Sequence, residues 1–188
     1  YSRIAEESGA ECVILTGDKD SLQLVSDKTN VLLPVTKQGM TTTSRMDIEA
    51  VKEKLGGAAP CQVVDLKALM GDTSDNIPGV PGVGEKTAEG LLCEYGTLDG
   101  IYERIDEIKK PALKKKLEEN KELAYLSKRL AEIVRDVPLG NAEAAAVERL
   151  ETLRLKNYSA ATLLRIFTRL EFKQLIKKMK LQERAEAE

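Results

Sequence analysis

The segment GVPGVGEKT, residues 79–87, decides the fold of the second half of this 188-residue chain. Its three glycines permit a tight turn in which the backbone can approach a ligand closely. The sequence after Gly84 suits an amphipathic helix, so amides at the helix start would point at a phosphate, and Lys86 adds charge beside them. The segment therefore predicts a phosphate-binding hairpin between two helices. A glycine-rich connection without any ligand is the alternative.

Two other phosphate-binding motifs do not fit this segment. In a P-loop the lysine directly follows the last glycine, whereas here Glu85 separates Gly84 from Lys86 and no strand precedes the loop. The dinucleotide-binding fingerprint requires a third glycine at the position of Thr87. The segment therefore argues against an enzyme that binds a nucleotide through either kind of loop.

Outward from the hairpin, the chain changes character at Gly71. Before it lie two apolar runs of strand length, residues 12–15 and 31–33, which are typical of strands buried on both faces of a sheet. After it come only turns and amphipathic helices. This order predicts an α/β fold, of which only the C-terminal part of the sheet is present, followed by an all-helical module. The expected helices span residues 2–8, 61–70, 85–94, 98–105, 112–119, 121–133 and 160–179.

Turn and capping residues set further boundaries. Pro34 is expected to end the second strand, because proline lacks the N–H that a sheet uses. Residues 37–39 have the chemistry of a hairpin turn. Ser44 and Asp47 resemble a capping box that opens a helix. The last residues, 182–188, are expected to form a solvated tail.

The composition excludes several functional classes. The chain has no histidine, which removes histidine-based triads, histidine metal sites and the commonest general base. With 29 basic and 31 acidic residues, its net charge of −2 provides no global field that would attract nucleic acid. No apolar stretch reaches the roughly 18 residues of a membrane span. The odd number and wide spacing of Cys12, Cys61 and Cys93 predict reduced thiols in the core of a cytosolic protein.

Two pairs of aspartates are the candidates for chemistry. Asp18 and Asp20 follow the first apolar run, at the carboxyl end of a strand, where ligands bind in open α/β sheets. Asp72 and Asp75 lie in a polar turn after a helix, where both can face one metal ion. Each pair has a simpler explanation, since Asp20 is a good N-cap for a short helix over residues 21–26 and polar turns favour aspartate. Together, four carboxylates without histidine suit an oxygen-only site for two divalent metals.

A basic cluster lies after the hairpin, and two interpretations of it stay open. It is either a surface for nucleic acid or a solvated helix face, the commoner meaning of a run of charges. Its members are Arg104, Lys109, Lys110, Lys114, Lys115 and Lys116. A second group, expected to be solvated, comprises Lys173, Lys177, Lys178 and Lys180.

In this order, the segments resemble the 5′ nuclease domain of bacterial DNA polymerase I, within the flap endonuclease family. The match covers most of residues 1–180, and its most specific run is LKALMGDTSDNIPGVPGV at residues 66–83. The other segments that carry it are ILTGDKD at 14–20, GEKTA at 84–88, ELAYLSKRL at 122–130 and LEFK at 170–173. The resemblance implies a partial PIN-like α/β nuclease core over 1–70, a helix-hairpin-helix DNA-binding module over 71–140 and a C-terminal helical extension over 141–188 that leads to following domains.

The resemblance also implies roles for individual residues. Asp18, Asp20, Asp72 and Asp75 would be catalytic carboxylates that hold Mg²⁺ or Mn²⁺ in a two-metal site. The hairpin would hold the phosphate backbone of duplex DNA, and K⁺ would bind there when DNA is present. The DNA-binding residues would be Gly79, Val80, Gly82, Val83, Gly84, Lys86 and Thr87.

The implied function is hydrolysis of DNA phosphodiesters by a metal-dependent, structure-specific 5′-3′ exonuclease or flap endonuclease during primer removal and repair. Polymerase domains would be covalently linked in the parent protein, a cytoplasmic, nucleoid-associated bacterial monomer without membrane contact. The family's first-strand carboxylates, upstream acidic cluster and helical arch are not in this sequence, so we expect a fragment that is inactive alone. The alternative is a non-catalytic helix-hairpin-helix module that only binds DNA.

Overall fold

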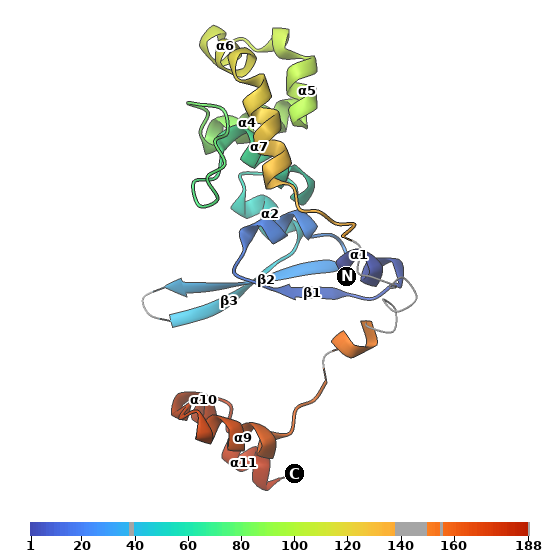
Figure 1. Ribbon diagram of the computed structural model, residues 1–188, viewed down its shortest axis with the longest axis vertical. Coiled ribbons are helices and arrows are strands. Elements are labelled where there is room, and N and C mark those ends of the chain that lie inside the picture. The colour runs from blue at the N-terminus through green and yellow to red at the C-terminus, as the bar shows by residue number, and fades with distance from the viewer. Residues whose placement is uncertain (38–39, 138–149, 155, 188) are drawn as a thin grey trace. The chain divides into compact units, whose positions relative to one another are not determined.

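The computed structural model describes residues 1–37, 40–137, 150–154 and 156–187. They belong to two compact units, Tyr1–Val147 and Glu148–Glu188 (Figure 1). The first contains, in chain order and with 3-10 helices labelled η, α1 (Ser2–Glu7), β1 (Cys12–Leu15), η1 (Lys19–Leu24), β2 (Thr29–Lys37), β3 (Met40–Met46), α2 (Ile48–Lys54), η2 (Pro60–Gln62), α3 (Val63–Met70), α4 (Glu85–Tyr95), α5 (Leu98–Glu103), η3 (Ile105–Glu107), α6 (Pro111–Glu119) and α7 (Lys121–Ala131). The second contains α9 (Ala160–Arg169), α10 (Lys173–Lys178) and α11 (Leu181–Glu186).

A three-stranded sheet of order β1-β2-β3 forms the N-terminal part of the first unit (Figure 1). β1 runs parallel to β2, with Ile14 opposite Val31, and β2 runs antiparallel to β3. The tip of the hairpin expected at residues 37–39 lies outside the described residues, but β2 and β3 pair on either side of it at Lys37 and Met40. The sheet therefore has one strand more than the apolar runs indicated, because β3 is a polar strand recognised only through its pairing.

Two expected boundaries were wrong. β2 continues through Pro34, and Ser44 lies within β3 instead of opening a helix. The carbonyl of Leu32 accepts a hydrogen bond from the Thr16 N–H, so Leu32 faces β1. Pro34 lies two residues further on, and its nitrogen therefore faces the same edge. At that point β1 has ended, so the missing N–H of proline leaves no described strand without a partner. α2 is capped by Asp47 alone, whose carboxylate accepts a backbone N–H of the first turn at 2.9 Å.

β1 is not buried on both faces, contrary to what its apolar run predicted. Val13 and Leu15 are 56% and 69% exposed, while Ile14 between them is partly buried against the core. Side chains of a strand alternate between its two faces, and only one face of β1 is packed against other described elements. β1 is also an edge strand, since its one described partner is β2.

The core beside the sheet is small. Leu22 and Val25 face inward as expected, although the segment that carries Leu22 is the 3-10 helix η1 instead of an α-helix. The buried members of this core are Leu22, Val25, Val31, Leu33, Met46, Val51 and Val63.

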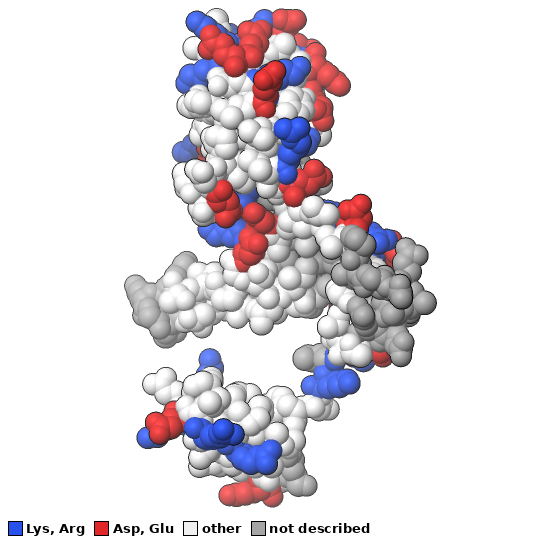
Figure 2. Space-filling view, in the orientation of Figure 1, with Lys and Arg blue, Asp and Glu red and all other residues white. Residues whose placement is uncertain are grey.

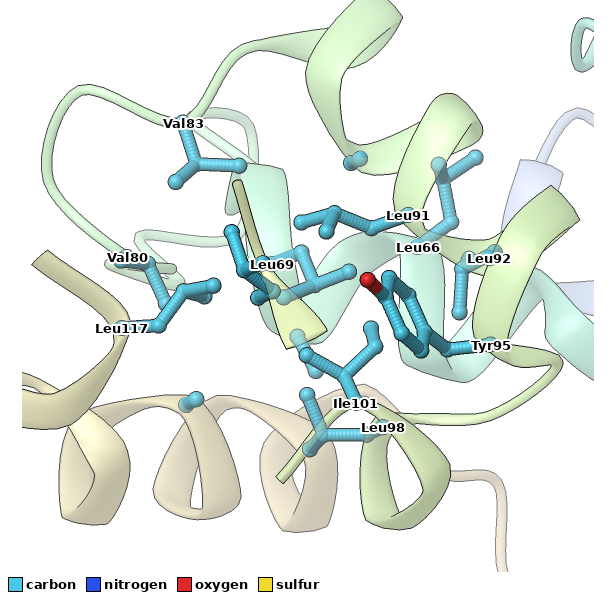
Figure 3. Close-up of a cluster of buried hydrophobic side chains, with 14 residues drawn as sticks. Leu66, Leu69, Val80, Val83, Leu91, Leu92, Tyr95, Leu98, Ile101 and Leu117 are labelled. Carbon is cyan, nitrogen blue, oxygen red and sulfur yellow. The ribbon is translucent and has the colours of Figure 1, made fainter. Parts of the chain in front are cut away.

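A larger core joins the helices of the first unit (Figure 3). α3 packs along α7, and the ammonium of Lys128 on α7 pairs with the buried carboxylate of Asp65 on α3 at 2.9 Å. The four helices expected between residues 85 and 133 are present, with ends that differ by a few residues. The buried members of this core are Leu66, Ala68, Leu69, Val80, Val83, Ala88, Leu91, Leu92, Tyr95, Leu98, Ile101, Ile108, Leu117 and Ala124.

The second unit is a small helical cluster. The single helix expected over residues 160–179 is two helices, because the chain breaks at Glu171, whose φ is +57°. The expected tail is helical, since α11 runs through it to Glu186, but most of its described residues are exposed as expected, and the fully buried Leu181 lies just before it. α11 packs against α9.

The proposed division at residue 70 falls inside the first unit. The two hydrophobic cores nevertheless separate close to it, since Val63 belongs to the smaller core and Leu66 to the larger one. The three cysteines are free, as expected, but Cys61 and Cys93 are exposed and not in the core. Among the described helices, none has the length and apolarity needed to cross a membrane.

Candidate metal centre and hairpin

Three of the four predicted aspartates converge. Asp20 lies in the first turn of η1, whereas Asp72 and Asp75 lie in the turn that follows α3. One carboxylate oxygen from each lies within 4.8 Å of the other two. The turn is closed by reciprocal backbone hydrogen bonds between Asp72 and Ile77 at 2.8 and 2.9 Å, and it brings both of its aspartates to the start of η1.

Asp18 lies outside this group of three. Its carboxylate accepts the backbone N–H of Asp20 at 2.9 Å, which makes Asp18, and not Asp20, the N-cap of η1. Asp18 nevertheless lines a cleft together with Asp20, Asp72 and Asp75. The capping explanation therefore applies to one member of the first pair, and the other member is the one that joins the cluster.

Lys67 is a residue of this site that the sequence patterns did not reveal. It projects from α3, is only 8% exposed, and places its ammonium 2.6 Å from Asp72 Oδ2 in an ion pair that also includes Asp20. The Lys67 ammonium and the hydroxyl and N–H of Ser74, all donating to the carboxylate, lower the pKa of Asp72 to about 2. The available signal was a lysine in the otherwise apolar run LKALM, within the helix predicted over residues 61–70.

The donor set of the cluster suits a hard divalent cation. Asp20, Asp72 and Asp75 offer only carboxylate oxygens, the ligands that Mg²⁺ and Mn²⁺ prefer. Their spacing allows one ion to contact all three groups, and three negative charges exceed the single positive charge of Lys67. The residues present therefore fit at least one divalent ion.

A cleft of about 660 Å³ connects this cluster to the hairpin. Its lining includes Asp20, Asp72 and Asp75 as well as Gly84 and Glu85, where α4 begins. The two features that the sequence nominated separately therefore open onto a single concave surface.

The hairpin is held against the turn that carries Asp72 and Asp75 by a close backbone approach. Gly79 has a φ of +64°, and a Cβ built on it would lie 2.2 Å from the backbone nitrogen of Gly71. Its N–H donates to the hydroxyl of the buried Ser127 at 3.0 Å. Gly82, with a φ of +75°, makes the second sharp bend. The glycines are required here for conformation and for space.

Free amides mark the outer surface of the hairpin. In the described structure, the backbone N–H groups of Gly82, Gly84, Glu85 and Lys86 have no acceptor. Those of Val80 and Val83 donate within the fold, and both valine side chains are buried, so these two residues support the hairpin from inside. Lys86 and Thr87 are exposed on the first turn of α4.

One member of the basic cluster reaches the hairpin. The ammonium of Lys116 on α6 lies 3.3 Å from the carbonyl oxygen of Gly82. Lys114 pairs with Asp106 at 2.6 Å, and Lys115 lies 3.6 Å from Glu119, so these neighbours have acidic partners of their own. Acidic and basic side chains are interspersed over the helices in Figure 2, in keeping with the small net charge.

A family model described as "5′-3′ exonuclease, C-terminal SAM fold" matches residues 58–153. The chain belongs to this 5′-3′ exonuclease family. The matched range includes α3, Lys67, the turn with Asp72 and Asp75, and the hairpin, whereas Asp20 reaches the cluster from outside it.

Relatives of this chain include bacterial DNA polymerases. DNA polymerase I of Caldicellulosiruptor bescii is 46% identical over 178 residues, which are 95% of this chain and 20% of that protein. DNA polymerase I of Bacillus subtilis is 42% identical over 187 residues, 100% of this chain and 20% of the relative. The chain therefore spans about a fifth of the length of these relatives.

Solved structures with a similar fold come from bacteriophage T5. A T5 5′-exonuclease with bound zinc is 26% identical, with a TM-score of 0.56 over 69% of this chain and 47% of that one. A T5 flap endonuclease in a pseudo-enzyme–product complex with DNA and metal ions is 25% identical over the same shares, also with a TM-score of 0.56. The sequence resemblance to 5′ nucleases is therefore confirmed at the level of family and fold.

Proposed function

We propose that this chain is the C-terminal part of the metal-dependent, structure-specific 5′-3′ exonuclease or flap endonuclease of a bacterial DNA polymerase I. The observation that carries the proposal is the convergence of Asp20, Asp72 and Asp75 on a cleft that also reaches the start of α4. A metal cluster and a phosphate-binding hairpin on one surface are what hydrolysis of a DNA phosphodiester requires.

In this proposal Asp20, Asp72 and Asp75 supply part of the ligand set for divalent ions, Mg²⁺ or Mn²⁺, with Asp18 at the edge of the same cleft. When bound, such ions lower the pKa of a coordinated water and stabilise charge on the phosphate. The chain's own groups act by position. Gly71 turns the backbone so that Asp72 and Asp75 face the start of η1. Asp18 caps this start, so that Asp20 faces the other two aspartates.

The hairpin is proposed to bind the sugar–phosphate backbone of duplex DNA, without contact to base edges. Free amides at Gly82, Gly84 and Glu85 supply donors, and Lys86 supplies charge, neither of which reads sequence. K⁺ is proposed to bind the hairpin when DNA is present. The support for this is the Gly82 carbonyl, which already accepts from the ammonium of Lys116 and therefore faces outward toward a cation.

Polymerase domains are proposed to accompany this chain in the parent, a monomeric protein of the bacterial cytoplasm that associates with the nucleoid. The support is the share of the relatives that the chain spans, about a fifth of each DNA polymerase I. Within that parent the nuclease would remove primers and process flaps and nicks during repair.

The chain alone is expected not to cleave DNA at a useful rate. A two-metal site holds its ions about 4 Å apart, and three clustered carboxylates are too few to fix both. A labelled 5′ flap incubated with Mg²⁺ or Mn²⁺ tests this, with Asp75→Asn as the control for contaminating nuclease. Cleavage that disappears in this control would show a self-sufficient site.

The alternative is a non-catalytic module that only binds DNA, and the observation in its favour is Lys67, whose ammonium lies within the acidic cluster. Titration of the chain with Mn²⁺ separates the two functions. The nuclease proposal predicts binding that weakens at least tenfold in Asp75→Asn, whereas a pure binding module predicts the same weak binding in both proteins and unchanged affinity for DNA.

A further inference from the structure

We infer that Lys67 is the resident counter-cation of the acidic cluster, and that a divalent ion must displace its ammonium from Asp20 and Asp72 in order to bind. The inference rests on the proposed metal site and adds a residue to it. The ammonium of this buried lysine would then set the equilibrium between the metal-free and the metal-loaded cluster.

The first argument is electrostatic. Three carboxylate oxygens within 4.8 Å of one another repel strongly when little water separates them, and Asp20 and Asp72 are both largely buried. In the described structure, Lys67 is the cation that contacts them. Its ammonium therefore compensates part of the negative charge, and this compensation allows the cluster to persist without a metal.

The second argument concerns space. The ammonium lies 2.6 Å from Asp72 Oδ2 and pairs with Asp20 as well, so it occupies the position between two of the three proposed ligands. An ammonium has no lone pair with which to join a coordination shell, and at this distance it repels a divalent cation. The two cations therefore compete for the same oxygens. The cleft of about 660 Å³ gives the flexible lysine side chain room to move away.

The chain contains a matched control, Lys128. This half-buried lysine of α7 also pairs with two aspartates, Asp65 at 2.9 Å and Asp99 at 3.5 Å. No third carboxylate joins that pair in a metal-like cluster among the described residues. Replacing either lysine removes a cation that pairs with two aspartates, but only the loss of Lys67 should affect the binding of a metal ion.

The experiment is a titration of the full chain with Mn²⁺ in the absence of DNA, followed by calorimetry. Lys67→Met should bind Mn²⁺ about tenfold or more tightly than the unmodified chain, since a neighbouring positive charge is gone. Lys128→Met should leave the affinity unchanged, and Lys67→Arg, which keeps the charge, should show no gain. Thermal unfolding in EDTA and in Mn²⁺ checks that the variants fold. Mn²⁺ should raise the unfolding temperature of Lys67→Met more than that of the unmodified chain.

Equal or weaker binding by Lys67→Met would overturn the inference, because the lysine would then be only a structural partner. Asp75→Asn separates this failure from failure of the metal site. If Asp75→Asn loses Mn²⁺ binding while Lys67→Met matches the unmodified chain, the site stands and the inference falls. If Asp75→Asn binds as the unmodified chain does, the proposed site and the inference both fall.

A measurement on the unmodified chain covers the case in which Lys67→Met does not fold. In ¹⁵N side-chain NMR of the lysine ammonium groups, the Lys67 resonance should shift on addition of Mg²⁺, while that of Lys128 should not. A Lys67 resonance that ignores saturating Mg²⁺ would overturn the inference.

Discussion

The aspartate turn, residues 71–78, and the hairpin that follows it, residues 79–84, touch each other but are held in different ways. The turn is closed by the backbone hydrogen bonds between Asp72 and Ile77 and is further ordered by charge, through Lys67 and the side-chain hydrogen bonds of Asp72. The hairpin is ordered by packing, through the buried side chains of Val80 and Val83 and the approach of Gly79 to Gly71. The turn should therefore respond to pH, to metal ions and to loss of charge, whereas the hairpin should be sensitive chiefly to added volume.

The largest expected effect is that of Gly79→Ala. A Cβ at this position would lie 2.2 Å from the nitrogen of Gly71, in a backbone conformation with φ of +64° that L-residues rarely adopt. The free energy of unfolding should fall by about 3 kcal/mol or more, as measured by urea denaturation. Gly84→Ala is the matched control, because its φ is −96° and its Cβ would meet no atom within 4 Å. If both variants are equally stable, the hairpin is not held by this close approach.

The next effect tests the charge-ordered turn. Asp72→Asn should lower the free energy of unfolding at neutral pH by about 1 to 2 kcal/mol, because it leaves the buried Lys67 with one partner fewer. Asp75→Asn should change it by less than about 0.5 kcal/mol, since the Asp75 carboxylate has no hydrogen bond or ion pair within the described structure. Both should weaken Mn²⁺ binding. Equal stability losses in the two variants would show that Asp75 also has a structural role.

A pH series sharpens the same contrast. The pKa of Asp72 is about 2 in the folded chain against an ordinary 3.8, so its contribution is present above about pH 4 and is lost as the pH falls toward 2. The stability difference between the unmodified chain and Asp72→Asn should therefore shrink over this range. Denaturation curves at pH 5, 4, 3 and 2 measure it, and Gly79→Ala should show a difference that does not depend on pH. A constant difference for Asp72→Asn would contradict the charge-based account of the turn.

The smallest expected effect concerns Lys116. Its ammonium lies 3.3 Å from the Gly82 carbonyl oxygen, so it should neutralise a phosphate bound at the hairpin. Lys116→Ala should weaken duplex binding a few-fold and reduce the slope of log affinity against log salt by about 0.9, the value for one phosphate. Lys86→Ala should do the same.

Lys115→Ala serves as the control for Lys116→Ala, because Lys115 is exposed on the same helix and lies 3.6 Å from Glu119. It should leave the salt slope unchanged. Equal slopes for the two variants would show that Lys116 does not contact a phosphate, and would favour the interpretation of the basic cluster as a solvated helix face.

Local sequence was a good guide where a conformation depends on neighbours in the chain. The end of α3 at Gly71, the start of α4 and the bends at Gly79 and Gly82 were all predicted from glycine and capping chemistry. The strand β3 was not, because its polar residues hold a strand only by pairing with β2. Nor was α11, whose Leu181 finds its burial against another helix.

The same distinction between local sequence and tertiary contacts applies to the candidate site. Residue type and spacing were sufficient to nominate four aspartates and the hairpin, since carboxylates in turns and glycines before a helix carry their chemistry in any fold. The selection among them needed contacts between distant segments. Asp20 and Asp72 are far apart in the chain, and only their meeting at Lys67 shows which aspartates share a site and which cation opposes them. Charge interactions of this kind depend on distance and burial, and neither is encoded in a local pattern.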